Sequence, residues 1–170
     1  ALDAISKPTI SMIKGYCVGG GCELSLATNC RIAASNSQFG IPAARLGIVI
    51  GYREMQRLVN LVGSGNAQYM LLSAHLLDAD EALRIGLVNR VLPLEELEEF
   101  TYTLANNIAD YAPLSYQVQK KILKTIVENP SLNNLNQEEK DMPFSVFDTE
   151  DFQEGTKAFM EKRKPLFRNR

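Results

Sequence analysis

Gly19, Gly20 and Gly21 are followed closely by Glu23, and this spacing could place a carboxylate beside an anion-binding backbone. The apolar residues 10–13 predict a strand before the glycines, and residues 20–28 have the pattern of a short helix. Glycine lacks a Cβ, so a ligand can approach its backbone closely, and the first N–H groups of a helix carry partial positive charge. The segment therefore has two interpretations: an oxyanion site with Glu23 as acid or base, or a tight turn that requires small residues.

Strands and helices alternate in the first part of the chain, which predicts α/β structure. Gly63 and Gly65 interrupt a helical pattern, and Asp78 is expected to cap a later helix that Gly86 ends. A β-rich run follows that helix at residues 87–91. We also expect a second strand at 30–34, a turn or short extended piece at 39–42, and helices at 52–62 and 66–72.

The pattern becomes helical from residue 93 onward. Pro113 suits a helix start, Pro130 stops the run that follows it, and Asp148 is the expected cap of the last helix. This change predicts two domains, a partial α/β core at residues 1–92 and a helical subdomain at 93–170. Several of these helices carry wide apolar faces, which favours burial against partner subunits.

Composition excludes several classes of function. The net charge of −2 argues against general nucleic-acid binding. The chain shows no apolar run near the ~20 residues that span a bilayer, and no signal peptide is visible at its start. Cys17, Cys22 and Cys30 fit a reduced compartment, lack zinc-site spacing and are interpreted as packing residues. His75 is the only histidine, which excludes a His-based triad within one chain.

Several separated blocks, in the right order, resemble the crotonase superfamily, the enoyl-CoA hydratase/isomerase family. These blocks run almost from end to end, so together they are far more specific than a lone glycine motif. They occupy residues 7–10, 15–24, 37–42, 46–47, 56–58, 82–88, 151–155 and 158–164. The resemblance implies a crotonase-like α/β fold of ββα units with a C-terminal helical subdomain. It also implies that the N-terminal third is absent, with much of the coenzyme A pocket and one oxyanion-hole donor.

The resemblance assigns roles to individual residues. Crotonases hold a thioester carbonyl with two backbone N–H groups, and the matching position for the second donor is Gly20. Glu23 matches the glutamate that hydratases use as acid and base beside the substrate. The same blocks place the expected substrate-binding residues Val18, Gly19, Pro42, Ala43 and Leu46 around this site.

Position 43 departs from the hydratase pattern, because Ala43 stands where hydratases carry a second glutamate. Hydration requires deprotonation of a water and delivery of a proton to the α-carbon, work that two carboxylates share easily. With Glu23 alone, water addition should be slower, although one group can in principle perform both steps. Alanine cannot titrate, but its presence leaves the stabilisation of an enolate intact.

The loop after Leu46 also departs from the family, since Tyr52 and Glu54 occupy places where small residues are usual. Some relatives put a catalytic residue in this loop, so Glu54 could be a relocated carboxylate and Tyr52 a hydrogen-bond donor. A structural interpretation competes with this one: Glu54 favours a helix N-terminus, and Tyr52 packs with its hydroxyl at the surface. We prefer the structural interpretation and keep both residues as candidate substrate contacts.

The last block matches the final helix of the family, which in relatives reaches the coenzyme A site, often that of a neighbouring subunit. By position, Phe159 would lie by the adenine and Lys162 by a phosphate. Six basic residues accompany one acid from residue 157 to 170, which suits an anionic ligand or a solvated helix end. We expect coenzyme A as part of the substrate thioester, no permanently bound cofactor and no metal.

The leading prediction is an acyl-CoA-processing enzyme that stabilises a thioester enolate, an enoyl-CoA hydratase/isomerase-like lyase of fatty acid metabolism. A decarboxylase of malonyl-type acyl-CoA, such as methylmalonyl-CoA, is the first alternative, because it needs no activated water. A non-catalytic coenzyme A-binding scaffold of the same fold is the second. The resemblance further implies a homotrimer or hexamer without nucleic-acid or membrane partners. Its expected location is the cytoplasm, or the mitochondrial matrix in a eukaryote.

Overall fold

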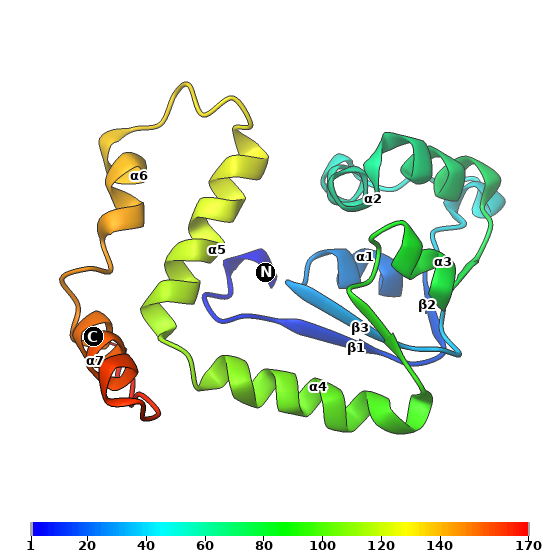
Figure 1. Cartoon of the computed structure of the whole chain (residues 1–170). Coiled ribbons are helices and arrows are strands. Elements are labelled where there is room, and N and C mark those ends of the chain that lie inside the picture. The colour runs from blue at the N-terminus through cyan, green and yellow to red at the C-terminus, as the bar shows by residue number, and fades with distance from the viewer. Residues whose placement is uncertain (1, 170) are drawn as a thin grey trace. The chain divides into compact units, whose positions relative to one another are not determined.

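The computed structural model describes residues 2–169, which fall into two compact units (Figure 1). The first unit runs to Ile5 and then from Thr9 to Leu104, and the second comprises Ser6–Pro8 and the chain from Ala105 onward. The strands are β1 (Ile10–Ile13), β2 (Tyr16–Val18), β3 (Cys30–Ala34), β4 (Gln38–Gly40), β5 (Leu77–Asp78) and β6 (Arg90–Leu92). The α-helices are α1 (Gly20–Leu26), α2 (Tyr52–Ser73), α3 (Ala79–Arg84), α4 (Leu94–Ala109), α5 (Pro113–Glu128), α6 (Gln137–Asp141) and α7 (Glu150–Glu161). Short 3₁₀ helices lie at η1 (Leu2–Ala4), η2 (Ala43–Leu46) and η3 (Met142–Phe144).

Two small sheets organise the first unit. β3 lies between β1 and β6 and is parallel to both, with Ile10 opposite Cys30. β4 lies between β2 and β5, parallel to β2 and antiparallel to β5, and Val18 is opposite Gly40. The consecutive strands β1 and β2 therefore belong to different sheets, and α1 connects β2 of one sheet to β3 of the other. Because parallel neighbours end at the same edge, the C-terminal ends of β2 and β4 lie together.

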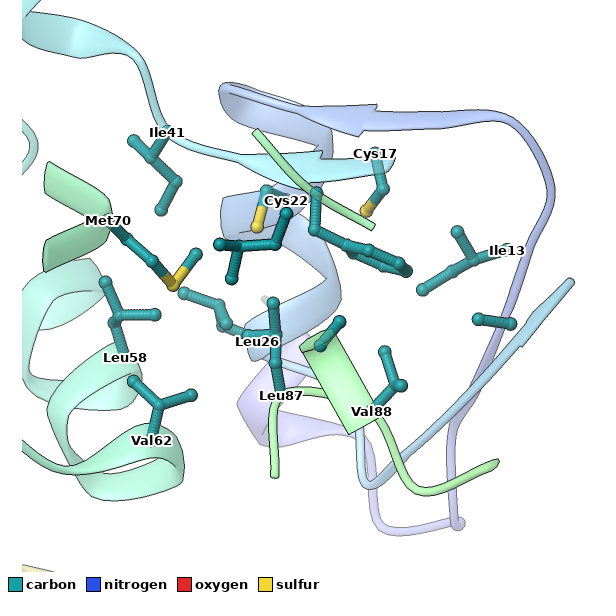
Figure 2. Close-up of a cluster of buried hydrophobic side chains, with 14 of the residues drawn as sticks. Ile13, Cys17, Cys22, Leu26, Ile41, Leu58, Val62, Met70, Leu87 and Val88 are labelled. Carbon is teal, nitrogen blue, oxygen red and sulfur yellow. The ribbon is translucent and has the colours of Figure 1, made fainter. Parts of the chain in front are cut away.

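The core of the first unit joins side chains from both sheets with side chains from α1, α2 and α3. Figure 2 shows Leu58, Val62 and Met70 of α2 converging on Leu26 of α1. Full burial of such a side chain contributes about 1.5–3 kcal/mol of stability. The packing of Leu26 and Cys22 therefore anchors α1, and with it the turn that precedes the helix.

Helix α2 bends at Gly63, where φ is 75° and ψ is 161°, so the predicted break in the helical pattern is confirmed. This combination of angles is essentially restricted to glycine. The bend allows Leu58 and Val62 before it and Met70 after it to reach the same core. Gly63 is thus required by the backbone path.

Replacing Gly63 with alanine should lower the free energy of unfolding by about 1–3 kcal/mol, because alanine is strained at these angles. Urea titration of the full chain measures the change. Gly65→Ala is the matched control, since Gly65 is helical and an added Cβ there meets no heavy atom within 4 Å. That variant should gain about 0.5–1 kcal/mol, because alanine suits a helix better than glycine. Equal stability of the two variants would contradict the proposed strain.

A buried arginine ties β3 to its surroundings. Arg31 is only 3% exposed, and burial lowers the pKa of its guanidinium. Its Nε donates to the Leu87 carbonyl at 2.8 Å, and its Nη1 donates to the Thr28 carbonyl at 2.8 Å. These carbonyls follow the C-terminal ends of α3 and α1, where the helix dipole favours a positive charge. Arg31 thereby ties the segments that follow α3 and α1 to β3, the central strand of its sheet.

The second unit is helical, and its helices start at recognisable caps. Pro113 is the first residue of α5, as predicted, and α5 ends at Glu128, before the expected stop at Pro130. Asn136 and Glu139 form a capping box at the start of α6. The predicted cap of the last helix, Asp148, is wrong: the Thr149 hydroxyl accepts the Phe152 N–H at 3.1 Å and caps α7 instead.

Other predicted bounds also need correction. The first helix ends at Leu26 instead of residue 28, because the Ala27 and Thr28 N–H groups close its last turn. Residues 38–40 form strand β4 through pairing with β2, where the pattern indicated a turn or short extended piece from 39. The strand expected at 87–91 lies at Arg90–Leu92, after a loop in which Leu87 and Val88 are buried.

Candidate active site

The turn between β2 and α1 is held by main-chain hydrogen bonds. Gly19 adopts φ 57° and ψ −126°, a conformation that residues with a Cβ rarely adopt. Its N–H donates to the Gly40 carbonyl at 2.8 Å, and its carbonyl accepts the Glu23 N–H at 3.0 Å. The tight turn that one interpretation of the glycine run predicted is therefore present, and the oxyanion site of the other stays a prediction.

Gly20 and Gly21 are the first two residues of α1. Both are exposed, and a Cβ placed on either meets no heavy atom within 4 Å. Gly20 is the first residue of α1, so its N–H is among those that a helix leaves without an intrahelical partner. The space beside the Gly20 Cα is therefore not filled by side chains of the turn.

Glu23 lies in the first turn of α1, three residues after Gly20. Residues three apart share a face of a helix, so Glu23 and Gly20 lie on the same face of α1. Glu23 is partly exposed, and the helix dipole stabilises a negative charge in the first turn. The turn thus places an exposed first helical residue, Gly20, and one carboxylate, Glu23, within the first turn of α1.

Cys17 in β2 and Cys22 in α1 lie on either side of the turn in the chain. Both are buried free thiols in the core (Figure 2). The hydrogen bond with the Cys17 thiol, together with burial, raises the pKa of Cys22, so this residue stays protonated. The Ser25 hydroxyl donates to the Cys22 carbonyl at 2.7 Å and adds a polar tie in the same helix. These contacts agree with the packing role predicted for both cysteines.

Pro42 and Ala43 continue from β4 at the edge where β2 also ends. Ala43 begins η2 and packs against the core of the first unit. The hydrogen bond from Gly19 to Gly40 joins the two segments directly. The structure therefore brings Val18, Gly19 and Gly20 to the same edge as Pro42 and Ala43, and of positions 23 and 43 only the former carries a carboxylate.

Leu46 ends η2, and the residues after it expose apolar side chains. Tyr52 begins α2 and is 97% exposed, so its ring does not pack within the described residues. Glu54 folds back over the start of α2: a Cβ on Gly51 would lie 2.5 Å from its Oε2, and Arg57 Nη1 lies 3.8 Å from its Oε1. These contacts match the structural interpretation of Glu54, and substrate contact by Leu46, Tyr52 and Glu54 stays a prediction.

The two residues expected near coenzyme A belong to the second unit. Phe159, in the last turn of α7, is 85% exposed. Lys162 follows that helix in a left-handed conformation with φ 53°, and its N–H donates to the Phe159 carbonyl at 3.2 Å. Both side chains are therefore accessible in this unit, and their contact with a ligand stays a prediction.

Two further features limit the chemistry that residues 2–169 display. No group of three or more His, Cys, Asp or Glu side chains is arranged for a metal ion within this range. The helices in the same range are too short or too polar to cross a bilayer.

The sequence interpretation missed one element of the site, strand β2. Tyr16–Val18 is only three residues long and follows Gly15, which makes it too short to give an alternating pattern. A usable signal was Gly15 itself, which has φ 72° and separates β1 from β2. The bond between Gly19 and Gly40 carried no sequence signal, because its partners are far apart in the chain.

Comparisons with known proteins agree with this geometry. The family profile described as enoyl-CoA hydratase/isomerase matches residues 1–170. A crotonyl-CoA hydratase of Syntrophomonas wolfei is 40% identical over 166 residues, which cover 98% of this chain and 64% of that protein. A methylmalonyl-CoA decarboxylase of Escherichia coli is 36% identical over 162 residues, which cover 95% of this chain and 62% of that protein. The chain therefore spans less than two thirds of the length of these curated relatives.

A solved structure is similar over almost the whole chain. The crystal structure of an enoyl-CoA hydratase/carnithine racemase from Magnetospirillum magneticum has a TM-score of 0.92 and 32% sequence identity. The superposition covers 99% of this chain and 62% of that one. The α/β fold that the resemblance implied is therefore confirmed.

Proposed function

The chain belongs to the enoyl-CoA hydratase/isomerase family, and on that premise we propose that the whole protein is an acyl-CoA-processing enzyme that stabilises a thioester enolate. Enoyl-CoA hydratase/isomerase-like chemistry is the leading assignment within this class. The observation that carries it is the open turn at Gly19 and Gly20, with Glu23 three residues into the following helix. A hydratase at 40% identity supports the substrate class.

In the proposed reaction the thioester oxygen accepts a hydrogen bond from the Gly20 N–H. Negative charge grows on this oxygen as the enolate forms, and a fixed donor stabilises that charge more than the neutral carbonyl. The bonds from Gly19 hold the donor in place before the substrate arrives. Glu23 transfers a proton to or from the α-carbon of the substrate. A second donor is expected from a part of the protein outside this chain, because the relatives are longer.

Ala43 makes decarboxylation of a malonyl-type acyl-CoA the second candidate. Loss of CO₂ produces the same enolate and requires a proton source, but no activated water. A methylmalonyl-CoA decarboxylase at 36% identity supports this alternative. Two assays separate the candidates: loss of the conjugated double bond of crotonyl-CoA in water, and release of CO₂ from methylmalonyl-CoA. Turnover of no thioester in a broad panel would favour the non-catalytic scaffold over both.

Replacing Ala43 with glutamate should raise water addition to crotonyl-CoA by about tenfold, because a second carboxylate can share the proton transfers. The gain is smaller than that of a native general base, since nothing has been selected to orient the new side chain. The rate is measured from the absorbance of the enoyl thioester. Ala43→Gln is the matched control, with the same size and no titratable group. Equal rates for the two folded variants would mean that the pocket is not shaped for hydration.

The nucleotide part of the substrate is proposed to contact Phe159 and Lys162, from the same copy of the chain or from a neighbouring one. An exposed aromatic ring can stack on adenine, and an ammonium can pair with a phosphate. We further propose a homotrimer or hexamer assembled through the helical second unit, in the cytoplasm or a mitochondrial matrix. No permanently bound cofactor or metal is part of this proposal.

A further inference from the structure

The chain turns back along α7 after the helix ends, and two carboxylates of that helix fasten the returning segment. Asp151 is 3% exposed. Its Oδ1 accepts the Arg168 N–H at 2.7 Å, and its Oδ2 accepts the Asn169 N–H at 3.0 Å. We call this arrangement the tail clasp. It comprises Asp151 and Glu154 of α7 together with Arg163, and it holds the segment 163–169 against the helix.

Glu154 supplies the second half of the tail clasp. Arg163 Nη1 donates to Glu154 Oε1 at 2.6 Å and Nη2 donates to Oε2 at 2.9 Å, a bidentate pair. The Leu166 N–H also donates to Oε1 at 2.8 Å. The Arg163 guanidinium, with help from the Leu166 N–H, lowers the pKa of Glu154 to about 2, so the carboxylate is charged at neutral pH.

Lys162 lies at the sharp turn that the tail clasp closes. Its φ of 53° is left-handed, a conformation uncommon for a residue with a long side chain. The next N–H, from Arg163, donates to the Ala158 carbonyl at 3.0 Å. Surrounding contacts must maintain such a conformation, and the bonds from Arg163 to α7 are adjacent to it in the chain.

The neighbouring cations are already engaged. Arg163 pairs with Glu154 and also with Glu161, whose Oε2 lies 2.7 Å from Arg163 Nε. Lys164 Nζ lies 2.6 Å from Asp110 Oδ2. Within residues 2–169, Lys162 has no ion-pair partner. Of these three consecutive cations, Lys162 is therefore the one whose charge is available to a ligand.

We infer that the tail clasp is a positioning device, in which Glu154, Arg163 and Asp151 fix the backbone of Lys162 so that its ammonium meets the phosphates of the coenzyme A thioester. This inference rests on the proposed function, which brings Lys162 to the nucleotide. Holding the turn in advance saves the cost of ordering it when the ligand binds.

The sign of the effect separates positioning from simple charge. A carboxylate near an anion-binding residue repels the anion. If charge alone mattered, removing that carboxylate should therefore strengthen anion binding. If Glu154 acts by holding the turn, its removal weakens binding instead. Glu161→Gln is the matched control, because it removes the same charge next to Lys162 while its carboxylate contacts the Arg163 side chain and not the tail backbone among the described residues.

The test measures dissociation constants of butyryl-CoA and of butyryl-pantetheine, which lacks the nucleotide and its phosphates, with the full chain and its variants. Lys162→Ala should weaken butyryl-CoA binding about tenfold, as expected for a charged hydrogen bond. Glu154→Gln should weaken it about two- to tenfold and should leave butyryl-pantetheine unchanged. Hydrogen exchange should be faster in this variant at the amides of Leu166 and Arg168. Arg163→Lys, which keeps the charge but loses the bidentate pair, should show the same selective loss.

The double variant Glu154→Gln/Lys162→Ala decides whether Glu154 acts through Lys162. Binding of butyryl-CoA no weaker than in Lys162→Ala alone supports the inference, because the effects of residues that act as one unit do not add. Three results would overturn the inference and leave the nucleotide contact standing. The first is additive losses of butyryl-CoA affinity in the double variant, and the second is an equal loss of affinity for both ligands in Glu154→Gln. The third is unchanged butyryl-CoA affinity in Glu154→Gln while Lys162→Ala binds butyryl-CoA weakly. Unchanged affinity in Lys162→Ala would overturn the contact and the positioning role together.

Discussion

Replacing Glu23 with glutamine is expected to lower turnover on acyl-CoA substrates by about 10²–10⁴-fold, the usual contribution of a positioned acid or base. Glutamine preserves the size of the side chain and cannot accept a proton. Position 43 carries alanine, so it cannot share the proton transfer proposed for Glu23. Steady-state kcat with the thioester panel measures the loss.

Two observations make the Glu23 experiment specific. Exchange of the substrate α-proton with deuterated water, followed by NMR, should fall in parallel with kcat, while the dissociation constant of coenzyme A should stay the same. Glu98→Gln, the same change at an exposed position of α4, is the control and should retain full turnover. Normal proton exchange in a folded Glu23→Gln variant would assign the proton transfer to another residue.

Replacing Gly20 with proline should lower turnover by about 10²–10³-fold, because proline removes the N–H proposed to hold the thioester oxygen. The first residue of a helix is a favourable place for proline, so α1 itself should persist. Gly20→Ala is the matched control, since it also introduces a Cβ, into space without heavy atoms within 4 Å, and keeps the N–H. Turnover is compared between the two variants with the same thioester.

The comparison between proline and alanine at position 20 isolates one hydrogen-bond donor. Equal activity of the two variants would remove Gly20 from the mechanism. Circular dichroism must show the same helix content in both, because proline also restricts the residue before it, and Gly19 has unusual angles. A loss confined to Gly20→Pro supports an oxyanion contact at this amide.

The local parts of the fold could be predicted from the sequence. Strands β1 and β3, the break at Gly63 and the cap at Asp78 followed from short-range patterns and are confirmed. Glycine requirements and helix caps are local effects, so a single sequence contains them. The resemblance then supplied the family, which residue spacing alone left open.

The parts that could not be predicted depend on contacts between distant residues. Strand β4 exists because it pairs with β2, and neither is long enough to give a clear alternating pattern. The tail clasp joins Arg163 to Glu154 across a turn at Lys162, where a glycine would have been the usual signal. Tertiary pairing thus decided the elements that local propensity left ambiguous.

The bond from Gly19 to Gly40 has a wider consequence, because both of its partners are main-chain atoms. The side chain at position 43, three residues beyond Gly40, therefore takes no part in the bond that holds the turn. In the proposed mechanism two tasks would then be separate: the peptide backbone of the turn would fix where negative charge accumulates, and position 43 would supply or withhold a second acid–base group.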